Sequence, residues 1–192
     1  MNTKYLDLIE QTFHFPQEEF RLEEDRLFFH DIDLMELVKE YGTPLKFSYL
    51  PKISENINKV KNWFKTAFDK LDYKGDYHYS YCTKSSHFKH VLNEALKNNI
   101  HIETSSAFDI DIIKTLKTAG KITNDNFILC NGFKRGAYIQ NIADLINSGH
   151  ENCLPIIDNY EELDILSAVI QKDFKIGIRI ASEEEPKFEF YT

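Results

Sequence analysis

From residue 77 onward, short apolar runs alternate with longer segments whose apolar positions recur every three or four residues. The short runs are typical of buried strands and the longer segments of amphipathic helices. One strand and one helix together take up roughly 25 residues, the spacing of βα units. The pattern predicts five strands, over residues 77–83, 100–104, 127–130, 154–157 and 175–180, separated by helices near 86–97, 107–119, 138–146 and 161–170.

The chain ahead of residue 77 has a weaker pattern. The apolar positions from Ile53 to Leu71 fall on one face of a helix. We expect two domains, a leader segment over residues 1–44 and a βα body over residues 45–192. The further elements predicted here are a hairpin over 20–22 and 27–29, a helix over 34–41 that ends at Gly42 and Pro44, and a strand over 45–50.

Consecutive βα units build either an open doubly wound sheet or a closed barrel. The turn after the strand at 77–83 reads Lys84-Ser85-Ser86-His87 and lacks the G-x-G-x-x-G pattern of dinucleotide-binding sheets. This difference favours the barrel. The predicted fold class is therefore α/β, a partial (β/α)8 TIM-type barrel with about five βα units.

Composition indicates a soluble globular protein. The chain has 192 residues, of which 42% are hydrophobic and 28% charged, and this is enough for one ordinary core. It has no apolar stretch of membrane-spanning length and no signal-peptide pattern at its start. Its three cysteines lie in separate apolar runs, which indicates buried thiols in a reducing compartment. We expect a cytoplasmic protein without a metal site or a membrane partner.

The net charge of −8 is unevenly distributed. Residues 1–44 carry 11 Asp and Glu against 4 Lys and Arg, whereas residues 45–192 carry 20 against 19. A nucleic-acid groove requires a basic stripe, which neither part provides. We therefore expect no nucleic-acid partner.

Polar side chains follow the predicted strands at their carboxyl ends, where barrel enzymes assemble their sites. Lys84 follows the first of the five, and a partly desolvated lysine amine there can form an imine with an aldehyde. Arg179 lies among isoleucines in the last, where a buried guanidinium needs an acidic or phosphate partner. The other polar residues are Glu103, Ser105 and Ser106 after the second strand, Asn131, Gly132 and Lys134 after the third, and Asp158 after the fourth.

Several of these residues also have a purely structural explanation. Ser106 can cap the helix that follows it, and Lys134 can point into solvent. For Asp158 we expect capping to be the whole role, with Glu161 in the reciprocal position of a capping box.

Five runs of sequence carry a family resemblance. They are Y-G-T-P-L at 41–45, Y-C-T-K at 81–84, I-E-T-S-S-A-F-D at 102–109, L-C-N-G-F-K at 129–134 and G-I-R-I-A-S at 177–182. In this order and at these separations they resemble motifs of the alanine-racemase-fold decarboxylases that use pyridoxal 5′-phosphate (PLP). The run at 129–134 is most similar to I-C-N-G-Y-K of the biosynthetic arginine decarboxylases.

The resemblance implies a role for each matched residue. Lys84 would be the catalytic residue that holds PLP covalently, and Glu103, Ser106 and Arg179 would line the cofactor pocket. The ring of PLP would take up the electrons released with carbon dioxide. The expected reaction is conversion of L-arginine to agmatine and carbon dioxide in polyamine (spermidine) biosynthesis, by an enzyme that is a homo-oligomer at full length. The alternatives are an ornithine, lysine or diaminopimelate decarboxylase, and a non-catalytic relative of the same barrel.

The family pattern continues beyond what these residues supply. Such enzymes have further barrel strands and a C-terminal β domain, to which nothing here corresponds. We therefore expect this chain to be the N-terminal part of a longer enzyme and to be inactive on its own.

Overall fold

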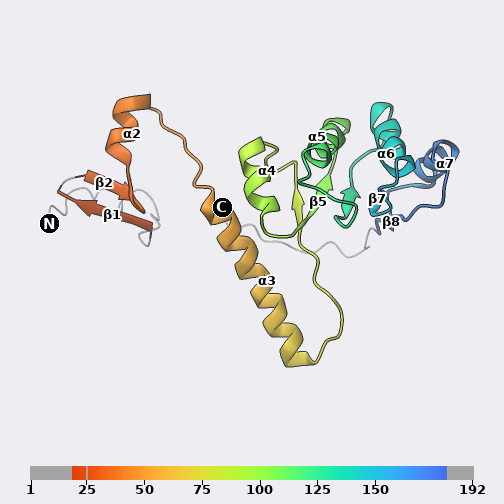
Figure 1. Cartoon of the computed structure of the whole chain (residues 1–192), viewed down its shortest axis with the longest axis horizontal. Helices are drawn as coiled ribbons and strands as arrows, with labels where there is room; N and C mark the ends of the chain where they lie inside the picture. Colours follow the sequence, from red (N-terminus) through yellow and green to blue (C-terminus); the bar gives the residue numbers. More distant parts are fainter. Residues whose placement is uncertain (1–18, 25, 181–192) are drawn as a thin grey trace. The chain divides into compact units, whose positions relative to one another are not determined.

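The computed structural model describes residues 19–24 and 26–180, and the labels of its elements are those of Figure 1. The chain forms two compact units that divide between Ser48 and Tyr49. Each unit is described by itself. Among the described helices, none has both the length and the apolar character needed to span a bilayer.

The first unit is a small antiparallel sheet with one helix (Figure 1). Asp33 caps the helix, because its carboxylate accepts hydrogen bonds from the backbone N–H groups of Met35 at 2.8 Å and Glu36 at 3.2 Å. The antiparallel pairing of residues 20–23 with 26–29 confirms the predicted hairpin, and the helix over 34–41 is confirmed as well. The elements are β1 (Phe20–Glu23), β2 (Arg26–Phe29), β3 (Ile32–Asp33) and α2 (Leu34–Tyr41).

The second unit is built on five parallel strands that lie in the sheet in the order in which they occur along the chain. This is the arrangement of a barrel wall, whereas a doubly wound sheet reverses its strand order at a switch point. The partial-barrel prediction is therefore confirmed. The strands are β4 (Ser80–Cys82), β5 (His101–Thr104), β6 (Ile128–Cys130), β7 (Cys153–Ile157) and β8 (Gly177–Ile178).

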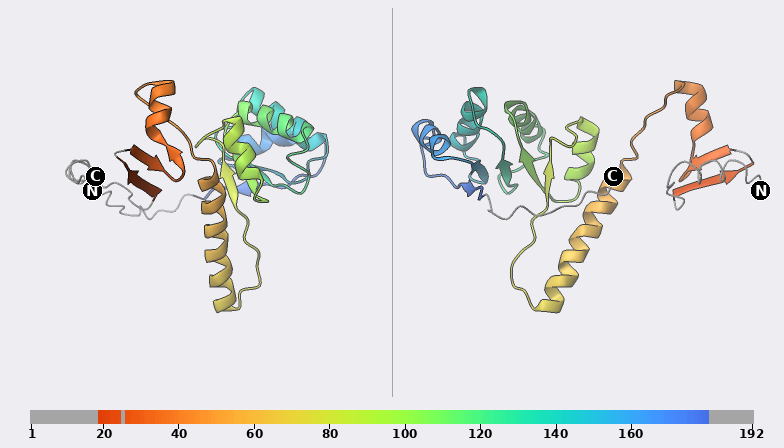
Figure 2. Two further views of the ribbon diagram at one scale, coloured as in Figure 1. Left: turned by 60° about the vertical axis from the view of Figure 1, so that its left-hand side comes forward. Right: turned by 180° about the vertical axis from the view of Figure 1, so that it is seen from behind.

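The core of this unit lies between the sheet and four helices that cover the same side of it (Figure 2). Successive strand residues point to opposite faces. On β5, Ile102 and Thr104 are fully buried toward the helices, whereas Glu103 on the other face is half-buried. That other face corresponds to the inner wall of a barrel. The helices are α4 (Lys89–Leu96), α5 (Ala107–Thr118), α6 (Ala137–Asn147) and α7 (Tyr160–Val169).

The long helix α3 (Pro51–Leu71) precedes the sheet, as the apolar periodicity predicts. It packs through Ile57, which is buried against Ala95 of α4 and Ile100. Its C-terminal half keeps large apolar side chains exposed, including Trp63 and Leu71.

Three predicted strands differ from the structure, and the one predicted over 77–83 is reduced to β4. Residues 45–50 form no regular secondary structure, and in the described part of the chain no strand pairs with them. An isolated strand cannot satisfy its backbone N–H and C=O groups, so the alternating pattern alone does not produce one. The strand predicted over 175–180 is reduced to β8, because among the described strands only β7 lies beside it.

Candidate active site

The carboxyl ends of the five parallel strands lie along one edge of the sheet, and the predicted site residues follow them. Lys84 lies in the turn after β4 and is exposed. Just before it, Thr83 is fully buried, and its N–H and hydroxyl both donate to the carbonyl of Glu103, at 3.0 and 3.1 Å. The backbone next to Lys84 is therefore fixed to β5. Among the described residues, its ammonium has no hydrogen-bond or ion-pair partner.

Glu103 lies on the inner face of the sheet, at the end of β5. Its Oε1 atom accepts a hydrogen bond from the side-chain amide of Asn131 at 3.2 Å. The same atom lies 3.7 Å from the Cys82 thiol, which can donate to it. Glu103 thus joins the ends of β4, β5 and β6, and its carboxylate is held in one orientation.

The loop after β6 approaches the loop after β5 closely. Gly132 has a φ of +75°, and a Cβ atom at this position would lie 2.8 Å from the carbonyl oxygen of Ser105. The Tyr138 hydroxyl donates to the carbonyl of Asn131 at 2.9 Å and lies 3.1 Å from the hydroxyl of Thr104. Burial raises the pKa of Tyr138, so this hydroxyl keeps its proton. The positive φ of Gly132 and its close approach to Ser105 explain why a glycine stands at position 132.

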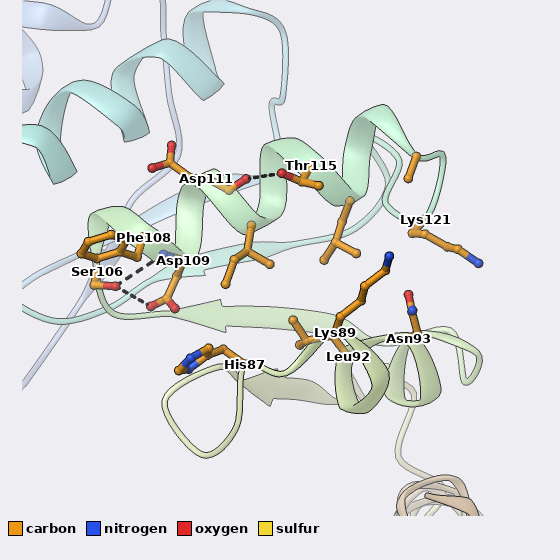
Figure 3. A pocket seen from close by; sticks show the side chains of 13 residues that line it. His87, Lys89, Leu92, Asn93, Ser106, Phe108, Asp109, Asp111, Thr115 and Lys121 are labelled. Atoms are coloured by element: carbon orange, nitrogen blue, oxygen red, sulfur yellow. Dashed lines mark hydrogen bonds between the residues drawn. The ribbon is translucent and has the colours of Figure 1, made fainter.

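Ser106 is the N-cap of α5, which is the structural role that the sequence suggests for it. Its hydroxyl accepts from the N–H of Asp109 at 3.4 Å and donates to the Asp109 carboxylate at 3.0 Å. Both residues line a groove of about 920 Å³ between α4 and α5 (Figure 3). None of these contacts reaches Glu103, so the structure joins Ser106 to the helix layer and not to the Glu103–Asn131 pair.

Arg179 follows β8, and its N–H donates to the carbonyl of Ile157 at 3.0 Å. The expected acidic partner is present, since its guanidinium lies 3.7 Å from the carboxylate of Asp158. The expected burial is wrong: the Arg179 side chain is 66% exposed, because β8 has a neighbouring strand on one side only among the described elements.

The role predicted for Asp158 is also wrong. The side chain that caps α7 is Asn159, which accepts from the N–H of Glu162 at 3.0 Å. Glu162, and not Glu161, occupies the third helical position, from which a capping-box carboxylate reaches back. It accepts the N–H of Asp158 at 3.2 Å. Asp158 is therefore free to pair with Arg179.

The sequence suggests that Lys134 points into solvent, but its side chain is fully buried. Its ammonium lies 3.2 Å from the carboxylate of Glu162, and it donates to the carbonyls of Gly132 at 2.9 Å and Ile156. Glu162 is buried as well. Although burial alone would raise the pKa of Glu162, the N–H groups of Lys134 and Asp158 and the Lys134 ammonium lower it below its ordinary range. The ionised form of Glu162 is thus favoured.

The structure therefore forms two groups at the strand ends. Glu103 and Asn131 make one, and Asp158 and Arg179 make the other. Lys84 lies after β4, the first of the five strands, and its side chain forms no bond to either group. No cluster of three or more His, Cys, Asp or Glu side chains suited to a metal ion occurs among the described residues.

Sequence reasoning missed Glu162, and it placed Asn131 at a strand end without naming a partner for it. For Glu162, the only local signal is its position three residues after Asn159, which indicates a helix cap and nothing more. For Asn131, the signal is its place after a strand whose neighbour carries Glu103; Glu103 pairs in register with Leu129, two residues before Asn131.

The fold is that of barrel decarboxylases. The chain superimposes on diaminopimelate decarboxylase from M. jannaschii with a TM-score of 0.71 at 18% identity, covering 88% of this chain and 37% of that one. It also superimposes on the biosynthetic arginine decarboxylase from Campylobacter jejuni, with a TM-score of 0.62 at 20% identity over 84% of this chain and 29% of that one.

The curated proteins that resemble the chain in sequence are biosynthetic arginine decarboxylases. The chain is similar to the N-terminal part of biosynthetic arginine decarboxylases, so the resemblance noted in its motifs is confirmed. It is 25% identical over 173 residues to the protein of Phocaeicola vulgatus and 24% identical over 172 residues to that of Bacteroides thetaiotaomicron. These alignments cover 83% and 82% of this chain, but only 27% and 26% of the relatives. No family model matches the chain.

Proposed function

We propose that this chain provides the first part of the catalytic barrel of a PLP-dependent arginine decarboxylase, which converts L-arginine to agmatine and carbon dioxide. The observation that carries the proposal is Lys84, an exposed lysine in the turn after β4, whose ammonium has no partner in the described part of the chain. An aldehyde cofactor requires an amine of this kind.

The residues present fit PLP. The amine of Lys84 is available for covalent attachment, whereas Lys134, on the next loop but one, is committed to its buried ion pair. Arg179 offers a guanidinium suited to an anionic group, and the oriented carboxylate of Glu103 faces the inner side of the sheet. When bound, PLP supplies an electron sink for the bond that breaks as carbon dioxide leaves. Ser106 fits less well, since its hydroxyl is used as a helix cap.

Arginine is favoured as the substrate because the similar curated proteins are biosynthetic arginine decarboxylases, and because the L-C-N-G-F-K run resembles theirs. A second candidate is diaminopimelate decarboxylase, which is favoured by the TM-score of 0.71 to the enzyme from M. jannaschii. A non-catalytic relative would have no need of the free amine at Lys84.

The test uses the protein encoded by the complete reading frame. It is incubated with PLP, reduced with borohydride and mapped by peptide mass spectrometry, and carbon dioxide release is measured from labelled arginine, ornithine, lysine and diaminopimelate. We expect the pyridoxyl group on Lys84, and release from arginine. Lys84→Ala should abolish both, whereas Lys121→Ala, at an exposed lysine beyond α5, should leave both unchanged. An adduct on another lysine would overturn the role of Lys84. Preferential release from diaminopimelate would instead support the second candidate.

A further inference from the structure

The buried ion pair of Lys134 and Glu162 lies at the same edge of the sheet as the candidate site. The Lys134 side chain is completely inaccessible and that of Glu162 is 7% exposed. Glu162 accepts two backbone N–H bonds in addition to the ammonium, from Lys134 at 3.1 Å and from Asp158 at 3.2 Å. The polar atoms of both side chains are therefore used within this cluster.

The pair connects three segments that are distant in sequence. The ammonium of Lys134 bonds to the carbonyl of Gly132 in its own loop and to that of Ile156 in β7. The carboxylate of Glu162, in the first turn of α7, accepts from the loop after β6 and from the residue that follows β7. The two side chains thus fix the loop after β6 to the end of β7.

Each fixed segment carries one of the two site groups. Gly132 directly follows Asn131, whose amide binds Glu103. Asp158, whose N–H is held by Glu162, binds Arg179 through its carboxylate. We propose that Lys134 and Glu162 are positioning residues, which set the distance and orientation between the Glu103–Asn131 group and the Asp158–Arg179 group. In its application to PLP this inference rests on the proposed function.

Stability alone is a poor explanation for such a pair. Two apolar side chains of similar volume often stabilise a buried position as well as an ion pair does, because they avoid the cost of desolvating two charges. An apolar pair could not, however, bind the carbonyls of Gly132 and Ile156 and the N–H of Asp158. What the charges add is therefore a defined geometry of these loops.

The test compares three variants in the protein encoded by the complete reading frame. Lys134→Met leaves the carboxylate unpaired, and Glu162→Gln leaves the ammonium unpaired. The double variant Lys134→Met with Glu162→Gln buries no net charge, so it keeps the fold where a single variant fails to fold. Ile113→Ala is the control, because Ile113 is fully buried in α5 and belongs to neither site group.

Two readouts are measured, namely the dissociation constant of PLP from its absorbance and hydrogen exchange at the backbone N–H of Gly132 and Asp158. In the double variant we expect about tenfold weaker PLP binding, as is typical when a supporting layer around a site is removed. We also expect faster exchange at these two positions than in α5. The control, which is destabilised throughout, should bind PLP as the parent protein does.

The outcomes separate this inference from the proposed function. A double variant with parental PLP affinity and parental exchange at Gly132 and Asp158 overturns the positioning role. Exchange that rises equally in α5 and at the two loops also overturns it, since the pair would then contribute only to global stability. If the parent protein binds no PLP, the proposed function fails, and selective exchange at the two loops still supports the positioning role.

Discussion

The side-chain amide of Asn131 donates a 3.2 Å hydrogen bond to the carboxylate of Glu103, and this bond joins the ends of β6 and β5. The two residues are 28 positions apart in the chain, yet they meet because their strands are neighbours in register. The candidate site is therefore a product of strand pairing. Changes that shift one loop against the next should affect it more than changes to exposed side chains nearby.

Gly132→Ala should destabilise the protein more than Gly120→Ala. Both glycines have positive φ, at +75° and +68°, which costs an alanine about 1–2 kcal/mol. The added methyl group at position 120 meets open space, whereas at position 132 it meets the carbonyl of Ser105 at 2.8 Å. We expect an additional loss of about 1–3 kcal/mol at position 132. Equal losses of unfolding free energy in urea would show that the loop after β6 moves away from Ser105 without cost.

Arg179→Met should change the free energy of unfolding of this chain by less than about 1 kcal/mol. The ion pair with Asp158 spans 3.7 Å and the guanidinium is largely exposed, so solvent screens most of the attraction. A buried arginine would instead lose about 3–5 kcal/mol. Denaturant titration of the variant distinguishes these values, and a loss in the higher range would mean that Arg179 is covered in solution.

Asn159→Ala should cost about 1 kcal/mol, because it removes the side chain that accepts the N–H of Glu162 at the start of α7. Asp158→Ala is the matched control and should cost less, since the bond that its side chain makes among the described residues is a 3.7 Å ion pair to the largely exposed Arg179. Thermal unfolding of the two variants provides the comparison. If Asp158→Ala were the more damaging change, Asp158 would be the cap after all.

Stability should fall as the pH drops below about 6.5, the ordinary pKa of histidine. His150 is fully buried, and its Nε2 donates to the carbonyl of Asn126 at 2.9 Å while its Nδ1 faces the Lys117 ammonium at 3.4 Å. Burial lowers the pKa of His150, and Lys117 lowers it further, despite the favourable bond to Asn126. The unfolded chain therefore binds the proton first, and stability is lost between the unfolded and the folded pKa.

The same measurement tests this assignment. Unfolding free energies of His150→Gln between pH 5 and pH 8 should depend less on pH than those of the parent chain. His90→Gln, at an exposed position on α4, serves as the control and should keep the parental slope. An unchanged slope in His150→Gln would assign the effect to other groups. His101 is one of these, since burial and the neighbouring His78 and Lys61 also lower its pKa.

The sequence predicts the βα succession because each strand is a short apolar run and each helix has its own periodicity. It fails where the outcome depends on distant partners. Residues 45–50 alternate like a strand but have no strand beside them in the described part of the chain. Arg179 lies in an apolar run that an uncovered edge leaves exposed. Neither result can be derived from the local pattern.

The candidate site shows the same division. The position of Lys84 at a strand end and an acidic partner for Arg179 follow from the pattern and from charge. The burial of Lys134 does not, because it depends on a carboxylate 28 residues away, in α7. A lysine after a turn ordinarily reaches water, whereas here the ammonium bonds to the carbonyl of Ile156 in β7 and to Glu162 in α7.

The chain order of the strands has a consequence for synthesis on the ribosome. Each parallel pair, from β4 with β5 to β7 with β8, joins segments separated by a single helix. Pairing between consecutive βα units closes shorter loops than pairing between distant segments would, and chains emerge from their N-terminal side at about 5–20 residues per second. The wall can thus assemble vectorially, with every newly emerged strand adding to an edge that is already in place.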